Sequence, residues 1–170
     1  MTKISKIMAL TALIILAIGI GTINNAVADE AENEAIIVRN SAEIWHKGNV
    51  AVIDEIVSKD YVRYMPGGVE FRGREGYKQH VLGMITSLPD YYASMDIMIS
   101  KGDYVVVRYL GSGTHTGEGG ILGPPTGKKV AFTAIVIHRL AGGMMAEDWV
   151  ELDNVSIMGQ FGYKLVPPSK

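Results

Sequence analysis

The sequence predicts an α+β fold in which three helices in the N-terminal half pack on a curved antiparallel sheet. Helical patterns occupy the chain up to Pro89, and every apolar run after Pro89 has the composition of a strand. Turns rich in glycine separate these later runs, which is typical of an antiparallel meander. Helices followed by a meander indicate an α+β domain, because the helices must cover one face of the sheet.

Three segments have the periodicity of amphipathic helices. The first covers residues 31–46, and the second covers residues 49–57 with Asn49 as its capping residue. The third covers residues 74–88, where apolar side chains recur every three or four positions until Pro89 ends the pattern. The first two helices are short enough to form an antiparallel pair.

Five runs are predicted to be strands. The first, residues 61–65, is aromatic and β-branched, and Pro66 stops it. The other four lie after Pro89, at residues 91–100, 104–116, 128–140 and 144–153. A sheet of this length that curves around one long helix leaves room for an apolar cavity at its open end, where a small ligand can bind.

The first 28 residues have the features of a signal peptide. Two lysines precede an apolar run over residues 7–20, and Ala26-Val27-Ala28 is an Ala-x-Ala cleavage site. A membrane-spanning helix needs about 20 apolar residues. We therefore expect cleavage after Ala28, a secreted or periplasmic protein with no stable membrane span, and one domain over residues 29–170. A membrane anchor retained through the uncleaved N-terminal segment is the alternative.

The composition excludes several classes of function. Residues 1–28 hold two of the 16 basic residues and none of the 18 acidic ones, so the remainder has a formal charge of −4. Without a basic patch, we expect no binding to nucleic acid. The absence of cysteine excludes disulfides and thiol chemistry. The four histidines show no metal-binding spacing, so we predict no metal site.

Four stretches of the sequence resemble one known family. They are Asp60-Tyr61-Val62, Gly113-Thr114-His115-Thr116-Gly117, Pro124-Pro125-Thr126-Gly127-Lys128, and Gly143 through Asp153 with Glu147-Asp148-Trp149 at its centre. Their order and spacing, with Gln160-Phe161-Gly162 near the end, are similar to those of the SnoaL-like family. This family comprises polyketide and ester cyclases of the NTF2-like superfamily, and the match covers essentially all of residues 29–170.

The resemblance implies a cone-shaped barrel, frequently a homodimer, that binds a small and mostly apolar molecule. Members of the family include cyclases that close a ring by an intramolecular aldol reaction without a metal or an organic cofactor. Such chemistry requires an acid/base side chain near the α-carbon of the substrate and a hydrogen-bond donor near the enolate oxygen. Relatives with the same fold isomerise, dehydrate or only bind their ligands, so the fold does not select the reaction.

The positions of the family's acid/base residues carry other side chains here. The catalytic carboxylate of the polyketide cyclases matches Val150, the accompanying histidine matches Val136, and a His-Asp pair of other members matches Tyr64-Met65. Because valine cannot transfer a proton, two hypotheses remain: an enzyme with a displaced acid/base group, and a non-catalytic binding protein. An interaction module that uses the exposed face of the sheet is the third.

Asp148 and His138 are the predicted catalytic residues. Alternate residues of a strand share a face, so Asp148 lies on the face of Val150, and His138 on that of Val136. A short turn joins the two strands, so a His/Asp dyad can form in which Asp148 moves a carbon-bound proton while His138 or Tyr64 polarises the carbonyl group. A solvated carboxylate and a half-exposed histidine are the alternatives, because the sequence does not fix the pairing register.

Further residues are expected to contact the ligand, with packing or ordinary hydrogen bonding as the alternative for each. Polar candidates offer hydrogen bonds to a carbonyl group or mark the mouth of the pocket, and apolar ones form its wall. A separate expectation is that Asp153 caps a short terminal helix. The predicted ligand-binding residues are Tyr64, Tyr77, His80, His115, Val136 and Val150.

Overall fold

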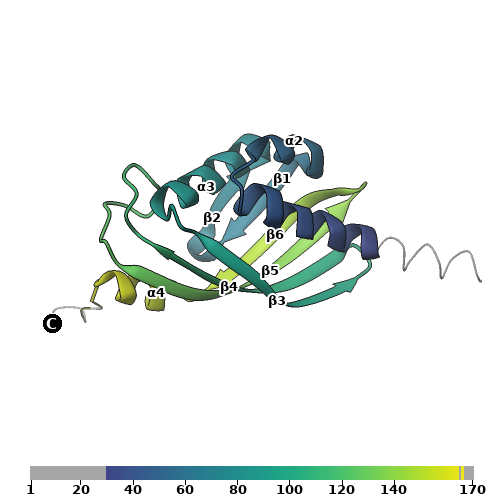
Figure 1. Ribbon diagram of the computed structural model, residues 1–170. Coiled ribbons are helices and arrows are strands. Elements are labelled where there is room, and N and C mark those ends of the chain that lie inside the picture. Colours follow the sequence, from purple (N-terminus) through teal and green to yellow (C-terminus); the bar gives the residue numbers. More distant parts are fainter. Residues whose placement is uncertain (1–29, 165, 167–170) are drawn as a thin grey trace, which may run out of the picture.

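The computed structural model describes residues 30–164 and residue 166, and shows a curved sheet beneath a layer of helices (Figure 1). The predicted signal peptide lies outside the described residues. The sheet has six strands in the order β2-β1-β6-β5-β4-β3. In the described part of the chain, no helix is both long and apolar enough to cross a membrane.

The helices occupy three segments before the meander, as predicted, and one after it. The N-terminal helix covers residues 30–45, and its last part, Asn40–Trp45, is the π-helical segment η1. The second is shorter than expected, with the 3-10 turn η2 (Val50–Val52) leading into one turn of α2 (Ile53–Ile56). The remaining two are α3 (Gly73–Ser87) and α4 (Asn154–Phe161).

The terminal helix α4 is capped as the sequence predicts. The carboxylate of Asp153 accepts a hydrogen bond from the backbone amide of Ser156 at 2.9 Å. This bond satisfies an amide that the first turn of a helix leaves without an intrahelical partner. Asp153 therefore has a structural contact at this position.

The strands confirm the predicted meander and correct the first part of the sheet. The strand β1 (Val57–Met65) begins four residues earlier than predicted, and the short turn η3 (Pro66–Gly68) connects it to an unpredicted strand β2 (Val69–Arg72). The sheet is also not wholly antiparallel, because β1 pairs in parallel with β6. The other strands are β3 (Tyr92–Lys101), β4 (Tyr104–Thr114), β5 (Lys129–Ala141) and β6 (Met144–Leu152).

The hairpin between β5 and β6 sets the register of the predicted dyad. Gly142 and Gly143 form its turn with φ angles of 58° and 73°, a left-handed conformation that glycine adopts without steric cost. The register shifts by one residue just after the turn, where Ala146 has no partner on β5. Beyond this bulge, His138 pairs with Asp148.

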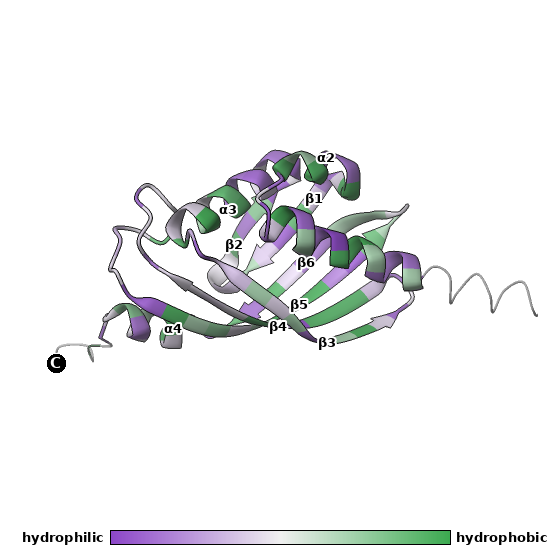
Figure 2. Cartoon of the chain, in the orientation of Figure 1, coloured by the Kyte–Doolittle hydropathy of each residue, from purple (hydrophilic) through white to green (hydrophobic). Residues whose placement is uncertain are grey.

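The main hydrophobic core lies between the helices and the hairpin end of the sheet. Figure 2 shows hydrophobic residues on the helices and on the strands that face them. A smaller cluster of Leu88, Val130 and Phe161 lies at the other end, against α4. The fully buried members of the main core include Ile37, Ile44, Ile53, Val57, Tyr61, Tyr77, Val81, Val105, Val107 and Met145.

Candidate active site

A cavity opens between the helices and the sheet, beyond the main core. Its volume is about 100 Å³. Most of its wall is apolar, and the polar residues come from the N-terminal helix, α3 and strands β1, β4 and β5. The hydrogen-bonding residues of chief interest are Asn40, Ser41, Arg63, His80, Tyr109 and His138.

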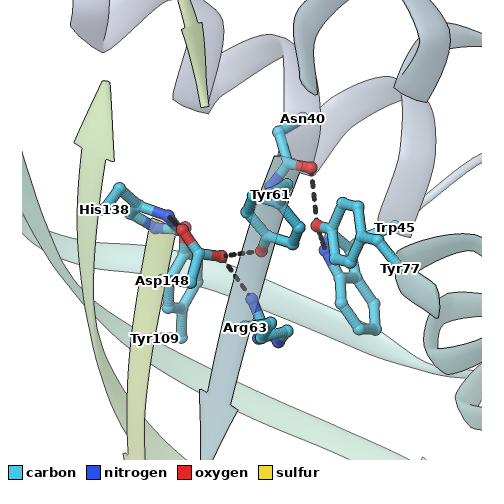
Figure 3. A network of polar contacts seen from close by, with 8 residues as sticks. All are labelled: Asn40, Trp45, Tyr61, Arg63, Tyr77, Tyr109, His138 and Asp148. Carbon is cyan, nitrogen blue, oxygen red and sulfur yellow. Dashed lines mark hydrogen bonds and ion pairs between the residues drawn. The ribbon is translucent and has the colours of Figure 1, made fainter. Parts of the chain in front are cut away.

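A buried cluster centred on Asp148 lies behind this wall (Figure 3). The Asp148 side chain is fully buried, and its Oδ2 accepts hydrogen bonds from Tyr61 Oη at 2.6 Å and from Arg63 Nη1 at 2.5 Å. Its Oδ1 is 2.7 Å from His138 Nδ1. Tyr61 and Arg63 share a face of β1, and the parallel pairing sets Arg63 opposite Asp148. Three adjacent strands therefore build the cluster.

The cluster keeps Asp148 and Arg63 ionised. Burial alone raises the pKa of Asp148, but His138, Arg63 and Tyr61 outweigh it and hold that pKa below the usual value. Burial works against the charge of Arg63 as well, yet Tyr61 and Asp148 raise the pKa of its guanidinium group. An ionised carboxylate with three donors is a weak proton acceptor, so Asp148 is suited to orienting its neighbours.

His138 connects the buried carboxylate to the cavity. With Nδ1 directed at Asp148, the imidazole carries its proton on Nδ1 and has a lone pair on Nε2 when it is neutral. Nε2 lies 3.3 Å from the hydroxyl group of Tyr109. Burial raises the pKa of Tyr109, so this hydroxyl keeps its proton and acts as a donor. His138 and Tyr109 both line the cavity.

The guanidinium group of Arg63 supplies a positive charge at the same wall. Its central carbon lies 5.7 Å from the ring centroids of both Trp45 and Tyr77, which is within the range of cation–π attraction. Only Nη1 bonds to Asp148, and Nε has no hydrogen-bond partner among the described residues. Arg63 is therefore a fixed donor at the boundary between the cluster and the cavity.

Half of the predicted site residues line this cavity. They are His80 on α3, Val136 and His138 on β5, and Val150 on β6. Val136 pairs directly with Val150, one step along the same inner face from the pair of His138 and Asp148. Asp148 lies behind the cavity wall, in contact with His138.

The other three predicted residues lie away from the cavity. Tyr64 stacks on Trp149 with ring centroids 5.6 Å apart, on the outer face of the sheet, because it alternates with Arg63 along β1. Tyr77 is fully buried in the core. His115 is buried at the end of the sheet that α4 covers, and its ring centroid lies 4.6 Å from that of Phe161.

Sequence reasoning missed Arg63, Tyr109, Asn40 and Ser41. The sequence contained a signal for Arg63, because it lies inside a short aromatic strand. If such a strand is buried, its arginine is expected to have a charged partner. Asn40 and Ser41 gave no such signal, since their direction depends on the π-helical segment. Among residues 30–164 and 166, no three His, Asp or Glu side chains gather in a way that would hold a metal ion.

Comparison with known proteins supports the fold and identifies the family. None of the curated proteins matches this chain. A protein from Jannaschia sp. CCS1 that is assigned to the SnoaL-like polyketide cyclases superposes with a TM-score of 0.73 at 21% identity, over 82% of this chain and 96% of that one. IdmH from Streptomyces antibioticus is assigned to the polyketide cyclases. It superposes with a TM-score of 0.65 at 26% identity, over 77% of this chain and 99% of that one.

A protein of ketosteroid isomerase-like fold from Catenulispora acidiphila, solved with trimethylamine, is also similar. It gives a TM-score of 0.63 at 16% identity, over 78% of this chain and 97% of that one. This likeness concerns the fold. The family model for SnoaL-like polyketide cyclases matches residues 35–161, most of the chain and every element that builds the cavity. The protein therefore belongs to the SnoaL-like polyketide cyclase family.

Proposed function

We propose that this protein catalyses proton transfer on a small, mostly apolar carbonyl compound, as a cyclase or isomerase that uses its own side chains as acid and base. The observation that carries the proposal is the geometry of His138, with Nδ1 bound to buried Asp148 and Nε2 directed toward Tyr109 at the cavity wall. A histidine held in this way accepts a proton at Nε2 while the carboxylate stabilises the imidazolium ion.

The roles differ from those that the sequence suggests for the dyad. Asp148 orients His138 and balances charge, because three donors occupy it and lower its pKa. His138 takes the part of the base. Removal of an α-proton places negative charge on the carbonyl oxygen, and Arg63 offers a fixed hydrogen-bond donor for it. Tyr109 offers a second hydrogen bond to that oxygen, and the imidazolium ion of His138 returns the proton to the substrate.

Enolisation of a simple ketone tests this proposal directly. β-Tetralone is apolar and has exchangeable α-protons, whose replacement in deuterium oxide is followed by NMR. We expect the wild type to accelerate the exchange. The acceleration by His138→Gln should be at least about 100-fold smaller, which is the lower end of what a general base contributes. His46→Gln is the matched control, since His46 is exposed and outside the cavity. Exchange by His138→Gln at the wild-type rate would refute the assignment.

A non-catalytic binding protein is the second candidate function. It is favoured by the pair of Val136 and Val150, two apolar side chains of the cavity wall at the positions where the family resemblance leads us to expect the acid and base of the polyketide cyclases. Native mass spectrometry of the purified protein separates the two candidates when combined with the exchange assay. A retained apolar molecule together with an exchange rate equal to that of buffer would favour binding alone.

Export is part of the proposed function. It rests on the apolar run over residues 7–20 and the Ala-x-Ala site before residue 29. The intact mass of protein recovered from the envelope or the medium checks it. We expect a chain that begins at Asp29, whereas a full-length chain in the membrane fraction would support the retained anchor.

A homodimer is the proposed assembly, with the outer face of the sheet as its interface. That face exposes four isoleucines of β3 and β5 at 39–62% of their surface. They are Ile97, Ile99, Ile135 and Ile137. Light scattering of the wild type and of Ile135→Glu tests the proposal, which predicts a dimer for the first and a monomer for the second.

A further inference from the structure

The helical wall of the cavity carries polar residues that the proposed proton transfer does not use. Asn40 is 2% exposed, Ser41 4% and His80 4%, and all three line the cavity. They belong to the N-terminal helix and α3, which lie over the sheet that carries His138 (Figure 1). Burying polar groups without partners costs free energy, so polar groups on such a wall are expected to position a ligand.

A relay of hydrogen bonds fixes the orientation of the Asn40 amide (Figure 3). Trp45 Nε1, which can only donate, donates to Tyr77 Oη at 2.9 Å. The Tyr77 hydroxyl therefore directs its own hydrogen to Asn40 Oδ1, 2.8 Å away. Because its oxygen is engaged by the core, Asn40 has its NH₂ group left as the donor for the cavity.

A π-helical turn brings this part of the helix to the cavity. At the C-terminal end of η1, the amide of the capping residue His46 donates to the carbonyl oxygen of Ser41, five residues earlier, at 3.1 Å. The widened turn sets Trp45 one turn after Asn40, so that Asn40, Ser41 and Trp45 all line the same cavity. π-Helical turns are rare and frequently occur at functional sites.

His80 completes the polar part of the helical wall as an uncharged group. Burial lowers its pKa to about 3, and the positive charge of Arg63 acts in the same direction. The ring packs on Phe71 and Trp45 at centroid distances of 4.4 and 5.6 Å, and its Nδ1 has no hydrogen-bond partner among the described residues. A buried ring nitrogen without a partner leaves one hydrogen-bonding group of this wall unsatisfied by the protein.

We propose that Asn40, Ser41 and His80 form a second subsite, which binds a neutral oxygen-bearing group of the ligand such as a hydroxyl or a ketone. This inference rests on the proposed function, which places the reacting carbonyl group near His138 and Arg63. The ligand then carries two oxygen functions separated by an apolar body. One faces the strands and reacts, and the other faces the helices and holds the molecule in position.

The charges of the site select a neutral group over a carboxylate. Asn40 and Ser41 are uncharged side chains, and His80 is neutral over the physiological range. The positive charge of Arg63 is already balanced by Asp148. A carboxylate on this wall would be buried without a counter-ion, which costs more free energy than its hydrogen bonds return.

Matched ligands and variants test the second subsite. The probes are β-tetralone, its ring-hydroxylated isomers and the corresponding carboxylates, with dissociation constants from calorimetry. We expect the wild type to bind at least one hydroxylated isomer about tenfold more tightly than β-tetralone, and Ser41→Ala and Asn40→Leu each to lose most of this preference. Ser112→Ala, which alters a serine outside the cavity, is expected to keep it.

The outcomes separate this inference from the proposed function. His138→Gln should abolish exchange while the preference for the hydroxylated isomer remains. If the wild type shows no exchange but the preference depends on Ser41, the function fails and the subsite stands. If the preference is absent from the wild type, or survives in both Ser41→Ala and Asn40→Leu, or if a carboxylate binds most tightly, the subsite is overturned. Ser41→Ala is a small change, which keeps the test independent of any folding defect in Asn40→Leu.

Discussion

The two walls of the cavity bury different kinds of polar residue. On the strand side, the charges of Arg63 and Asp148 lie in direct contact, and Tyr61 and His138 complete the hydrogen bonds of the carboxylate. On the helical side, Asn40, Ser41 and His80 are uncharged. The difference shows that charge enters this interior only with its counter-charge, whereas neutral polar groups are tolerated with partners still to be supplied.

Breaking the charged wall should have the largest effect. Asp148→Leu leaves Arg63 buried without its partner, and we expect the free energy of unfolding to fall by about 3–5 kcal/mol. Urea denaturation measures the change. The double variant Arg63→Met, Asp148→Leu removes both charges and should recover part of the loss, because no guanidinium group is then buried without a partner, although Tyr61 and His138 still lack their acceptor. A double variant as unstable as the single one would contradict this account.

Protonation of His80 on the neutral wall should destabilise the folded protein in acid. Burial places the pKa of folded His80 at about 3, below its ordinary value of 6.5, so protons bind the unfolded chain preferentially. The stabilisation is complete above about pH 6.5 and is lost as the pH falls toward 3. Between pH 7 and pH 5, the preferred protonation of His80 in the unfolded chain should lower the free energy of unfolding by about 2 kcal/mol. One unit of pKa corresponds to about 1.4 kcal/mol. Asp148, whose pKa is lowered, loses its contribution only below about pH 4.

The variant His80→Leu isolates that effect. Its free energy of unfolding, from urea titrations at both pH values, should decline less between pH 7 and pH 5 than that of the wild type. His46→Leu serves as control, because His46 is exposed. Equal pH dependence of the wild type and His80→Leu would show that His80 is not the acid-sensitive group of this wall.

The relay behind the helical wall should contribute less. Tyr77→Phe removes the hydroxyl that joins Trp45 to Asn40, and leaves both with an unsatisfied group. We expect a loss of about 1.5 kcal/mol in the free energy of unfolding. The preference for a hydroxylated ligand should weaken as well, because the side-chain amide of Asn40 can then rotate and exchange the positions of its oxygen and its NH₂ group. Unchanged ligand preference in Tyr77→Phe would show that the relay does not orient Asn40.

The smallest effect on stability is expected at Tyr109. Its hydroxyl lies 3.3 Å from His138 Nε2, a long and weak contact. Tyr109→Phe should change the free energy of unfolding by only about 0.5 kcal/mol. Its exchange rate with β-tetralone should nevertheless decline, because one hydrogen-bond donor to the enolate oxygen is lost. A normal rate in Tyr109→Phe would show that this hydroxyl does not stabilise the enolate.

The predictable part of the candidate site follows from strand periodicity. The rule that alternate residues share a face correctly places Val150 beside Asp148 and Val136 beside His138. The same rule, applied to the first strand, sets Tyr64 and Arg63 on opposite faces without saying which face is inward. The inward face is that of Arg63, because the parallel neighbour presents Asp148 there.

The pairing of His138 with Asp148 depends on one irregular residue. Continuing the register of the glycine turn would place His138 opposite Glu147. The bulge at Ala146 shifts β6 by one residue, which brings Asp148 opposite His138 and leaves Glu147 to pair with Arg139 on the outer face. A bulge reflects packing on both sides of a strand, so no local pattern in this sequence predicts it.

The sequence by itself determined the class of fold, the meander, the capped terminal helix and the family, because these depend on local periodicity and on motifs close together in the chain. The tertiary structure decided the parallel contact of β1 with β6, the partners of Asp148 and the polar helical wall. Those features join residues 85 or more positions apart, such as Arg63 and Asp148, or depend on a bulge and a π-helical turn. Their free energy is realised only when the whole cavity has formed, because a buried charge is stable only beside its partner.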